Sequence, residues 1–294
     1  MQKTITLFGL IFLLPLSVLA TKGNFGEAEK QLQTLLSQMR TVQGDGERNA
    51  LNDEFKTLLR TTLHQKGAFN YPFDSLGNYM STMKAPDGKF RLFNWNLANN
   101  DRTYSYFCYV MYYDKREKEY RIEELKDNPK TVDKIEDKVL FQTHWFGALY
   151  HDIIPQKKGG RTYYTVLGWK GKDRFSTVRV IDVIYFQGRQ LKMGAPLFLV
   201  QNKLKKRVVM EHRADTQISI KFHSKNERIV FDHLSSGNNI TSASITQGAD
   251  NSYDSYEWKK NKWVFVGDVT VNGERTKHDR DYVDPQGDPF GRHR

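Results

Sequence analysis

The sequence predicts a mainly β protein, built as an antiparallel meander, barrel or sandwich and preceded by an N-terminal αα-hairpin. Apolar residues recur at helical spacing between residues 26 and 64, with a glycine-rich break in the middle. From Lys89 onward the spacing changes to period two, and the chain becomes rich in β-branched and aromatic residues. These segments are short and separated by turn residues, which is typical of antiparallel sheets. The predicted parts are a signal peptide at 1–20, a helical hairpin with a loop at 21–85, an antiparallel β domain at 86–270 and a flexible polar tail at 271–294.

The first twenty residues have the layout of a secretory signal peptide. Lys3 precedes an apolar run from Ile5 to Leu19, and Val18 and Ala20 supply small residues before a cleavage point. The run is about 15 residues long, whereas a membrane-spanning helix needs about 20. We therefore favour a cleaved signal over the alternative of a membrane anchor, and we expect an exported protein.

Two apolar stripes predict the helical hairpin. The first stripe ends at Met39, and Gly44 and Gly46 then interrupt the pattern. The second stripe resumes at Leu51 and continues to Leu63. Two helices joined by a glycine-rich turn form an αα-hairpin, which we expect to pack against the rest of the protein.

Period-two alternation predicts the strands that follow. We expect strands at 89–97, 103–113, 118–125, 144–150, 161–169, 174–187, 196–200, 205–212, 216–222, 228–234, 253–259 and 262–269. Residues 126–138 are a charged connector, and residues 235–251 are a Ser/Gly/Asn-rich loop. Three strands place a tryptophan before a polar turn, but their uneven spacing makes a weak pattern for propeller-like repeats.

Segment 103–113 is apolar and aromatic on both faces. A strand of this kind is expected to be central and covered on both sides, with the helices on one of them. It contains Cys108, the single cysteine of the chain, so an internal disulfide is excluded. We interpret Cys108 as a small buried hydrophobic residue.

The net charge of +11 is spread along the chain rather than concentrated in one segment. An exported protein rarely meets nucleic acid, and no RNA-binding signature or zinc finger is present. The partners that fit this charge are an anionic lipid surface, an acidic glycan or an acidic protein. We expect an envelope protein or glycan as partner, with association at a membrane surface as a further option.

Three stretches, GKFRLFNWNL, RTYYTVLGWKGKDRFSTVRVIDVIYF and TQISIKFHSKNERIVFDHL, resemble exported β-rich proteins of Bacteroidota whose activity is uncharacterised. The resemblance spans about residues 86 to 266. It implies an exported protein of a Gram-negative bacterium, in the periplasm or associated with the outer membrane. It implies no known activity, so no functional residues can be carried over to this chain.

Sequence motifs for common chemistries are absent. The chain contains no GxxxxGK[ST] phosphate loop, no GxGxxG before a helix, no HExxH and no GxSxG elbow. Catalytic groups can also come from distant strands, so an enzyme is not excluded by this. We expect no cofactor.

Asp182 and Arg179 are charged residues in an otherwise apolar strand. In alternation, Asp182 lies on the face of Val178, Val180 and Ile184, and Arg179 lies on the opposite face. The two side chains therefore cannot pair with each other. A carboxylate in this position requires a raised pKa or a buried partner.

His212 and His233 are the remaining candidates, for a metal site. The stretch KFHSKNERIVFDHL is predicted to be a β-hairpin that turns around 224–227, and in a regular strand Asp232 and His233 project to opposite faces. If segment 205–212 paired with segment 216–222, His212 would align with His233 two strands away, at about 9.6 Å. That distance is long for a zinc ion shared by two imidazoles, so we predict no metal site.

These observations favour an exported, non-catalytic binding or scaffold protein of the bacterial envelope. The alternative is an envelope hydrolase that acts on a glycan or a peptide. An enzyme of this kind would use Asp182 or one of the histidines, and it needs at least two titratable groups in one pocket.

Overall fold

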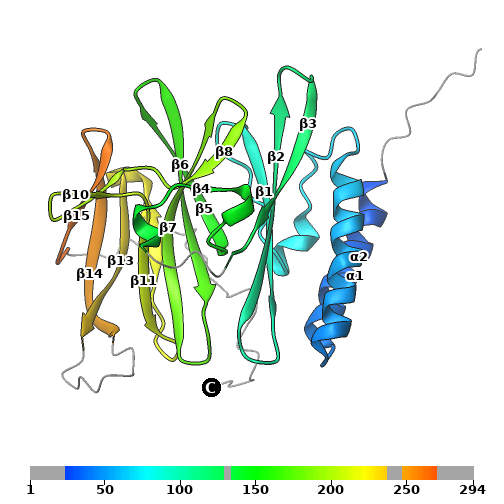
Figure 1. Cartoon of the computed structure of the whole chain (residues 1–294), viewed down its shortest axis with the longest axis horizontal. Coiled ribbons are helices and arrows are strands. Elements are labelled where there is room, and N and C mark those ends of the chain that lie inside the picture. The colour runs from blue at the N-terminus through cyan, green and yellow to red at the C-terminus, as the bar shows by residue number, and fades with distance from the viewer. Residues whose placement is uncertain (1–23, 129–133, 237–246, 270–294) are drawn as a thin grey trace, which may run out of the picture.

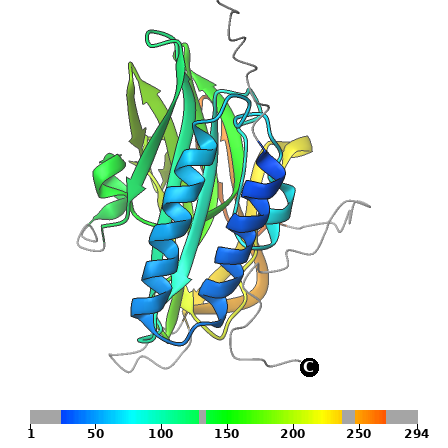
Figure 2. The same ribbon diagram turned by 90° about the vertical axis from the view of Figure 1, so that its right-hand side faces the viewer.

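The computed structural model describes residues 24–128, 134–236 and 247–269 (Figure 1). The predicted signal peptide and polar tail lie outside these residues, as does the middle of the 126–138 connector. Helix α1 (Phe25–Thr41) and helix α2 (Asp45–Leu63) form the predicted pair. Figure 2 shows them side by side across one face of a sheet. The side chain of Asn24 caps α1 by accepting a hydrogen bond from the backbone N–H of Glu27.

Fifteen strands are present in the described residues, and their bounds are as follows. They are β1 (Phe90–Ala98), β2 (Tyr104–Asp114), β3 (Glu119–Lys126), β4 (Leu140–Phe141), β5 (Leu149–Lys158), β6 (Arg161–Gly171), β7 (Ser176–Gln187), β8 (Gln190–Met193), β9 (Phe198–Val200), β10 (Lys203–Lys205), β11 (Val208–Arg213), β12 (Ile220–His223), β13 (Arg228–Ser236), β14 (Gln247–Lys259) and β15 (Lys262–Val266). Short 3₁₀ turns lie at Asp74–Asn78, Ile135–Asp137, Gln142–His144 and Ser224–Asn226.

These strands form three sheets. The first has the order β1-β2-β3, the second β4-β8-β7-β6-β5 with β11 also paired to β7, and the third β10-β9-β15-β14-β13-β12. Every pairing between named strands is antiparallel except β15 with β9, which is parallel. The mainly β, antiparallel fold with an N-terminal helical pair is therefore confirmed, and it is built from stacked sheets (Figure 1).

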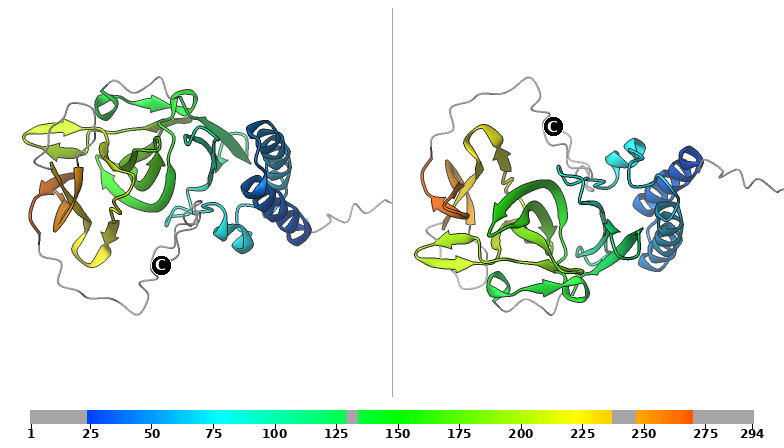
Figure 3. Two further views of the ribbon diagram at one scale, coloured as in Figure 1. Left: turned by 90° about the horizontal axis from the view of Figure 1, so that it is seen from below. Right: turned by 90° about the horizontal axis from the view of Figure 1, so that it is seen from above.

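Three apolar cores lie between the layers. The first joins the helices to sheet β1–β3, the second joins that sheet to the β4–β8 sheet, and the third joins the β4–β8 sheet to the β9–β15 sheet. Figure 3, which views the molecule from below and from above, shows the same succession from the helices to β14 and β15. The two middle sheets thus bury both of their faces.

Strand β2 shows how the sequence specifies this arrangement. Tyr109 and Met111 enter the core beneath the helices, whereas Cys108 and Val110 enter the core shared with the β4–β8 sheet. The prediction that this strand is covered on both sides is confirmed, with the helices on one of them. Cys108 is fully buried, and burial raises the pKa of its thiol far above the ordinary value.

Some strand predictions were wrong in their extent. The segment predicted at 144–150 is strand β5 at Leu149–Lys158, where polar residues and Pro155 hid the strand pattern. Proline is tolerated there because β5 is an edge strand. The predicted loop at 235–251 also contains strand, since β13 extends to Ser236 and β14 begins at Gln247.

Asp182 has the buried partner that its apolar surroundings require. The Arg207 Nε lies 3.1 Å from Asp182 Oδ2, and both side chains are completely buried. The Asp182 Oδ1 accepts a hydrogen bond from the backbone N–H of Val183 at 2.7 Å. Arg207 also donates to the carbonyls of Ile135 and Lys138, so the ion pair fastens the connector before β4 to the centre of β7.

We predict that Asp182→Asn lowers the free energy of unfolding by about 3–5 kcal/mol, because the substitution leaves the Arg207 charge buried without its counter-ion. Urea unfolding followed by circular dichroism measures this loss. The double variant Asp182→Leu/Arg207→Met should lose less, because it removes both charges. A loss for Asp182→Asn of about 0.5 kcal/mol, as for a surface substitution, would contradict the role of the pair.

Candidate functional site

The structure separates the residues that the sequence singled out. Arg179 lies on β7, next to Trp169 of β6 and Met210 of β11 in the sheet register, and it is partly buried. Asp182 lies on the other face of the same strand with Arg207. The expectation that Arg179 and Asp182 do not pair agrees with these positions.

His212 is not placed where the metal hypothesis required it. Strand β11 pairs with β7, with His212 opposite Thr177, and not with β12. The His212 Nδ1 donates to the Arg213 carbonyl at 2.9 Å, which leaves Nε2 to accept from the Thr177 hydroxyl at 3.1 Å. The alignment of His212 with His233 across β12 was therefore wrong, because β11 joins a different sheet.

His233 lies at an irregularity of β13. The register shifts between Asp232 and Leu234, so the regular strand assumed from the sequence is interrupted at His233. The His233 Nδ1 lies 2.8 Å from the Asp254 Oδ2, whereas the Asp232 carboxylate accepts from the backbone N–H of Ser219. Despite the irregularity, Asp232 and His233 contact different groups. Within the described residues, no cluster of three His, Cys, Asp or Glu side chains is arranged to hold a metal ion.

A large cleft lies elsewhere in the described part of the chain. Its volume is about 880 Å³, and it opens at the end of the gap between sheet β1–β3 and the β4–β8 sheet. Its walls come from α2, the β1–β2 turn, the start of β2, the end of β3, the segments on either side of β4, the β6–β7 turn and β11. The lining residues are Lys56, Asn99, Thr103, Tyr104, Ser105, Tyr106, Phe107, Glu124, Leu125, Lys126, Asp127, Asn128, Ile135, Phe146, Lys170, Gly171, Lys172, Val178, Val209 and Glu211.

Lys170 and Asp127 are the most buried charges of this cleft. The Lys170 Nζ donates to the Phe146 carbonyl at 2.6 Å and lies 3.4 Å from the Asp127 Oδ1. Burial lowers the pKa of Lys170, and the Asp127 charge partly offsets this. Burial likewise raises the pKa of Asp127, and Lys170 partly offsets that shift. The ammonium also lies 4.7 Å from the centre of the Tyr106 ring and 5.0 Å from that of Phe146.

Two further lysines of the cleft are paired with carboxylates. Lys56 Nζ lies 2.8 Å from Glu124 Oε1, and Lys172 Nζ lies 2.7 Å from Glu211 Oε1. These pairs are more exposed than Lys170 and Asp127. The cleft therefore presents donors and acceptors side by side, with its charges largely balanced.

Two glycines allow the cleft walls to approach each other. A Cβ atom on Gly171 would lie 2.4 Å from carbons of the Tyr104 ring, and one on Gly147 would lie 2.3 Å from the Asp127 carboxylate. The hydroxyl of Tyr106 accepts from the backbone N–H of Gly171 at 2.6 Å, which ties β2 to the end of β6. The sequence contains a signal for this close approach in the strand segment GWKGK. A glycine inside a strand often marks a position where another part of the chain comes close to the backbone. The residues of this cleft were not predicted from the sequence.

No protein-family model, curated protein or solved structure matches this chain. The resemblance to exported Bacteroidota proteins therefore stays a prediction.

The surroundings of His212 predict a pH-dependent stability. Burial lowers the pKa of His212, as does the Arg179 charge, while the hydrogen bond to Arg213 and the charges of Asp232 and Glu211 act in the opposite direction. A histidine with a lowered folded pKa stabilises the fold above its unfolded pKa of about 6.5, and that contribution is lost as the pH falls below this value.

We therefore expect the free energy of unfolding to fall more steeply below about pH 6.5 in the native protein than in His212→Gln. Urea unfolding at several pH values measures both slopes. Parallel curves for the two proteins would show that His212 is not kept neutral by the fold.

Proposed function

We propose that the protein is an exported, non-catalytic binding protein of a bacterial envelope and that the cleft between sheet β1–β3 and the β4–β8 sheet binds a segment of neutral glycan. The observation that carries this proposal is the cleft itself, with its aromatic walls and its paired charges. A volume of about 880 Å³ is within the range of small-ligand sites.

The aromatic side chains suit the C–H groups of sugar rings. Tyr104, Phe107 and Phe146 line the cleft, and the Tyr104 ring is held edge-on to Trp169 at 5.3 Å. Aromatic faces carry partial negative charge and pack well against C–H groups that are weakly positive. Rings held rigidly in this way lose little freedom when a ligand binds.

The polar side chains suit hydroxyl groups, each of which donates and accepts a hydrogen bond. Asn99 supplies an amide, and Thr103 and Ser105 supply hydroxyls. Lys170 and Asp127 supply a donor and an acceptor side by side at greater depth. A cleft with balanced charges favours a neutral, polyhydroxylated ligand over a strongly charged one. A charged ligand would lose its water on binding, and the cleft has no surplus of opposite charge to compensate for that cost.

The residues named for the hydrolase alternative are not brought together. Asp182, His212 and His233 have different partners, so they do not converge in one pocket. The cleft carboxylates Glu124, Glu211 and Asp127 are each paired with a lysine, so none of them is a lone acidic group.

A glycan array of neutral and charged oligosaccharides, followed by titration calorimetry, tests the proposal. We expect binding of a neutral oligosaccharide, weakened about two- to tenfold in Tyr104→Ala because an aromatic contact is removed. Tyr113→Ala is the matched control, since Tyr113 is 47 % exposed and does not line this cleft. Absence of any neutral ligand with a Kd below about 1 mM would contradict the proposal. Release of new reducing ends during the titration would favour the hydrolase alternative.

Export is tested separately. No helix among the described residues is both long and apolar enough to span a membrane. We expect the protein purified from its native bacterium to begin near Thr21, and N-terminal sequencing together with intact mass measures this. A mature chain that retains Met1 in the cytoplasm would contradict export and leave the glycan proposal to its own test.

A further inference from the structure

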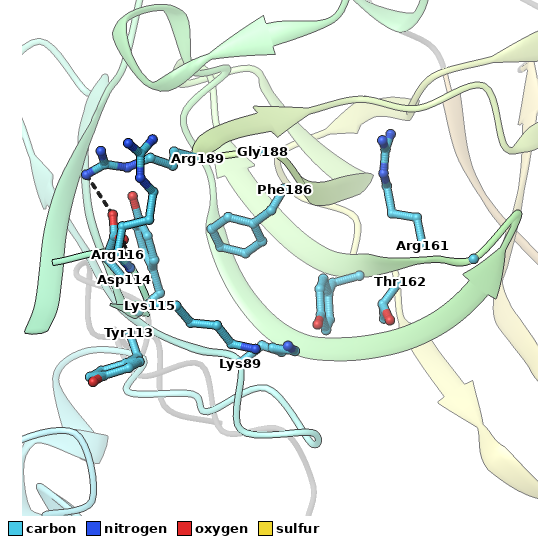
Figure 4. Close-up of a pocket in the computed structure, with 13 residues that line it drawn as sticks. Lys89, Tyr113, Asp114, Lys115, Arg116, Arg161, Thr162, Phe186, Gly188 and Arg189 are labelled. Carbon is cyan, nitrogen blue, oxygen red and sulfur yellow. Dashed lines mark hydrogen bonds and ion pairs between the residues drawn. The ribbon is translucent and has the colours of Figure 1, made fainter. Parts of the chain in front are cut away.

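A second pocket lies at the opposite end of the same inter-sheet gap. The large cleft is lined by the start of β2, whereas this pocket is lined by the end of β2 and by three turns, β2–β3, β5–β6 and β7–β8. Its volume is about 500 Å³ (Figure 4). It is independent of the proposed glycan cleft in both its residues and its chemistry.

Cationic side chains dominate the lining of this pocket. They are Lys89, Lys115, Arg116, Arg161 and Arg189, and the lining contains one carboxylate, Asp114. Figure 4 shows Phe186 in the middle, with Arg116 and Arg189 on one side of it and Arg161 on the other. This surplus of positive charge differs from the large cleft, where the three lysines described above each have a carboxylate partner.

The carboxylates near the pocket are already engaged. Asp114 Oδ2 lies 2.7 Å from Arg189 Nη2, and Arg189 also pairs with Glu117. Asp87, just outside the lining, accepts from the Tyr164 hydroxyl at 2.7 Å and from the backbone N–H of Lys89 at 3.1 Å.

Four cations remain without a counter-ion among the described residues. The side chains of Lys89, Lys115 and Arg116 make no ion pair or hydrogen bond there, and the Arg161 guanidinium lies over the Tyr185 ring at 5.8 Å. Several like charges around one concave site create a positive potential that attracts an anionic ligand.

The floor of the pocket is aromatic rather than polar. The hydroxyl of Tyr164 donates to Asp87, and that of Tyr112 donates to Glu123 Oε1 at 2.5 Å, so both rings present carbon to the pocket. The partly exposed Phe186 ring adds to this surface and packs against Tyr112 at 5.1 Å. A ligand that fills the pocket therefore carries an apolar ring or chain next to its charge.

We infer that this pocket binds a phosphate monoester attached to a ring or an acyl chain. A phosphate monoester carries close to two negative charges at neutral pH and three acceptor oxygens, which match a pocket lined by several cations better than a single carboxylate does. The forked guanidinium groups of Arg116 and Arg161 are suited to phosphate oxygens. The same group occurs on soluble aromatic phosphates and on phosphorylated membrane lipids.

Titration calorimetry with phenyl phosphate, with phenol as the uncharged analogue, tests the inference. We expect binding of phenyl phosphate and none of phenol, with an affinity that falls as the NaCl concentration rises. Arg116→Gln and Arg161→Gln should each weaken binding by about tenfold, because each removes a charge-assisted hydrogen bond. Arg116→Gln removes no described contact, so its effect is not attributable to misfolding. Lys30→Gln, an equal change of charge on the exposed face of α1, should leave the affinity unchanged.

A second arm with vesicles separates the two sources of the phosphate group. Phosphatidylcholine vesicles with and without phosphatidic acid are mixed with the protein and sedimented. Binding to phosphatidic acid vesicles that Arg116→Gln weakens would support a lipid source, and binding of phenyl phosphate alone would support a soluble one. Tyr104→Ala should alter neither result, which distinguishes failure of this inference from failure of the glycan proposal. The inference is overturned if neither probe binds, or if Lys30→Gln weakens binding as much as Arg116→Gln.

Discussion

The burial of two consecutive sheets on both of their faces is the constraint on which the rest of this structure depends. Sheet β1–β3 lies between the helices and the β4–β8 sheet, which in turn lies against the β9–β15 sheet. Strands in this position are apolar on both faces, and a charge such as Asp182 needs a partner as deeply buried as itself. The gap between the two middle sheets is filled along its length, so space for a ligand is left at its two ends. The balanced cleft and the cationic pocket occupy those ends.

Features that depend on local pattern were predictable from the sequence. The helices follow from apolar spacing between 26 and 64, and the two-sided burial of β2 follows from its apolar residues on both faces. Alternation identified Asp182 as a charge in an apolar setting, although its partner Arg207 lies in a segment whose position depends on the tertiary fold. The hairpin between β12 and β13 was also predictable, because a turn and two alternating segments adjoin in sequence.

Features that depend on pairing between distant segments were not predictable. Strand β11 is followed closely by β12 in the sequence, yet it pairs with β7. It occupies the first half of a β7 edge whose second half is paired with β8. Nothing in the residues of β11 specifies that neighbour. The large cleft was missed for a related reason. Lys170 looks like an ordinary polar residue at a strand end. It becomes a buried donor because two distant segments, the one after β3 with Asp127 and the one before β5 with Phe146, are brought to it by the fold.

The parallel pairing of β15 with β9 has a consequence for the order in which the protein can be completed during synthesis. Among the described strands, β15 is the last to leave the ribosome, and it lies between β9 and β14. Trp263 of this strand is fully buried and donates from its indole to the Thr165 hydroxyl at 2.9 Å, which reaches into the neighbouring sheet. Until that residue emerges, β9 and β14 each have an open edge and the third core lacks its largest side chain. A nascent chain therefore keeps both of these edges open until Lys262–Val266 has left the ribosome.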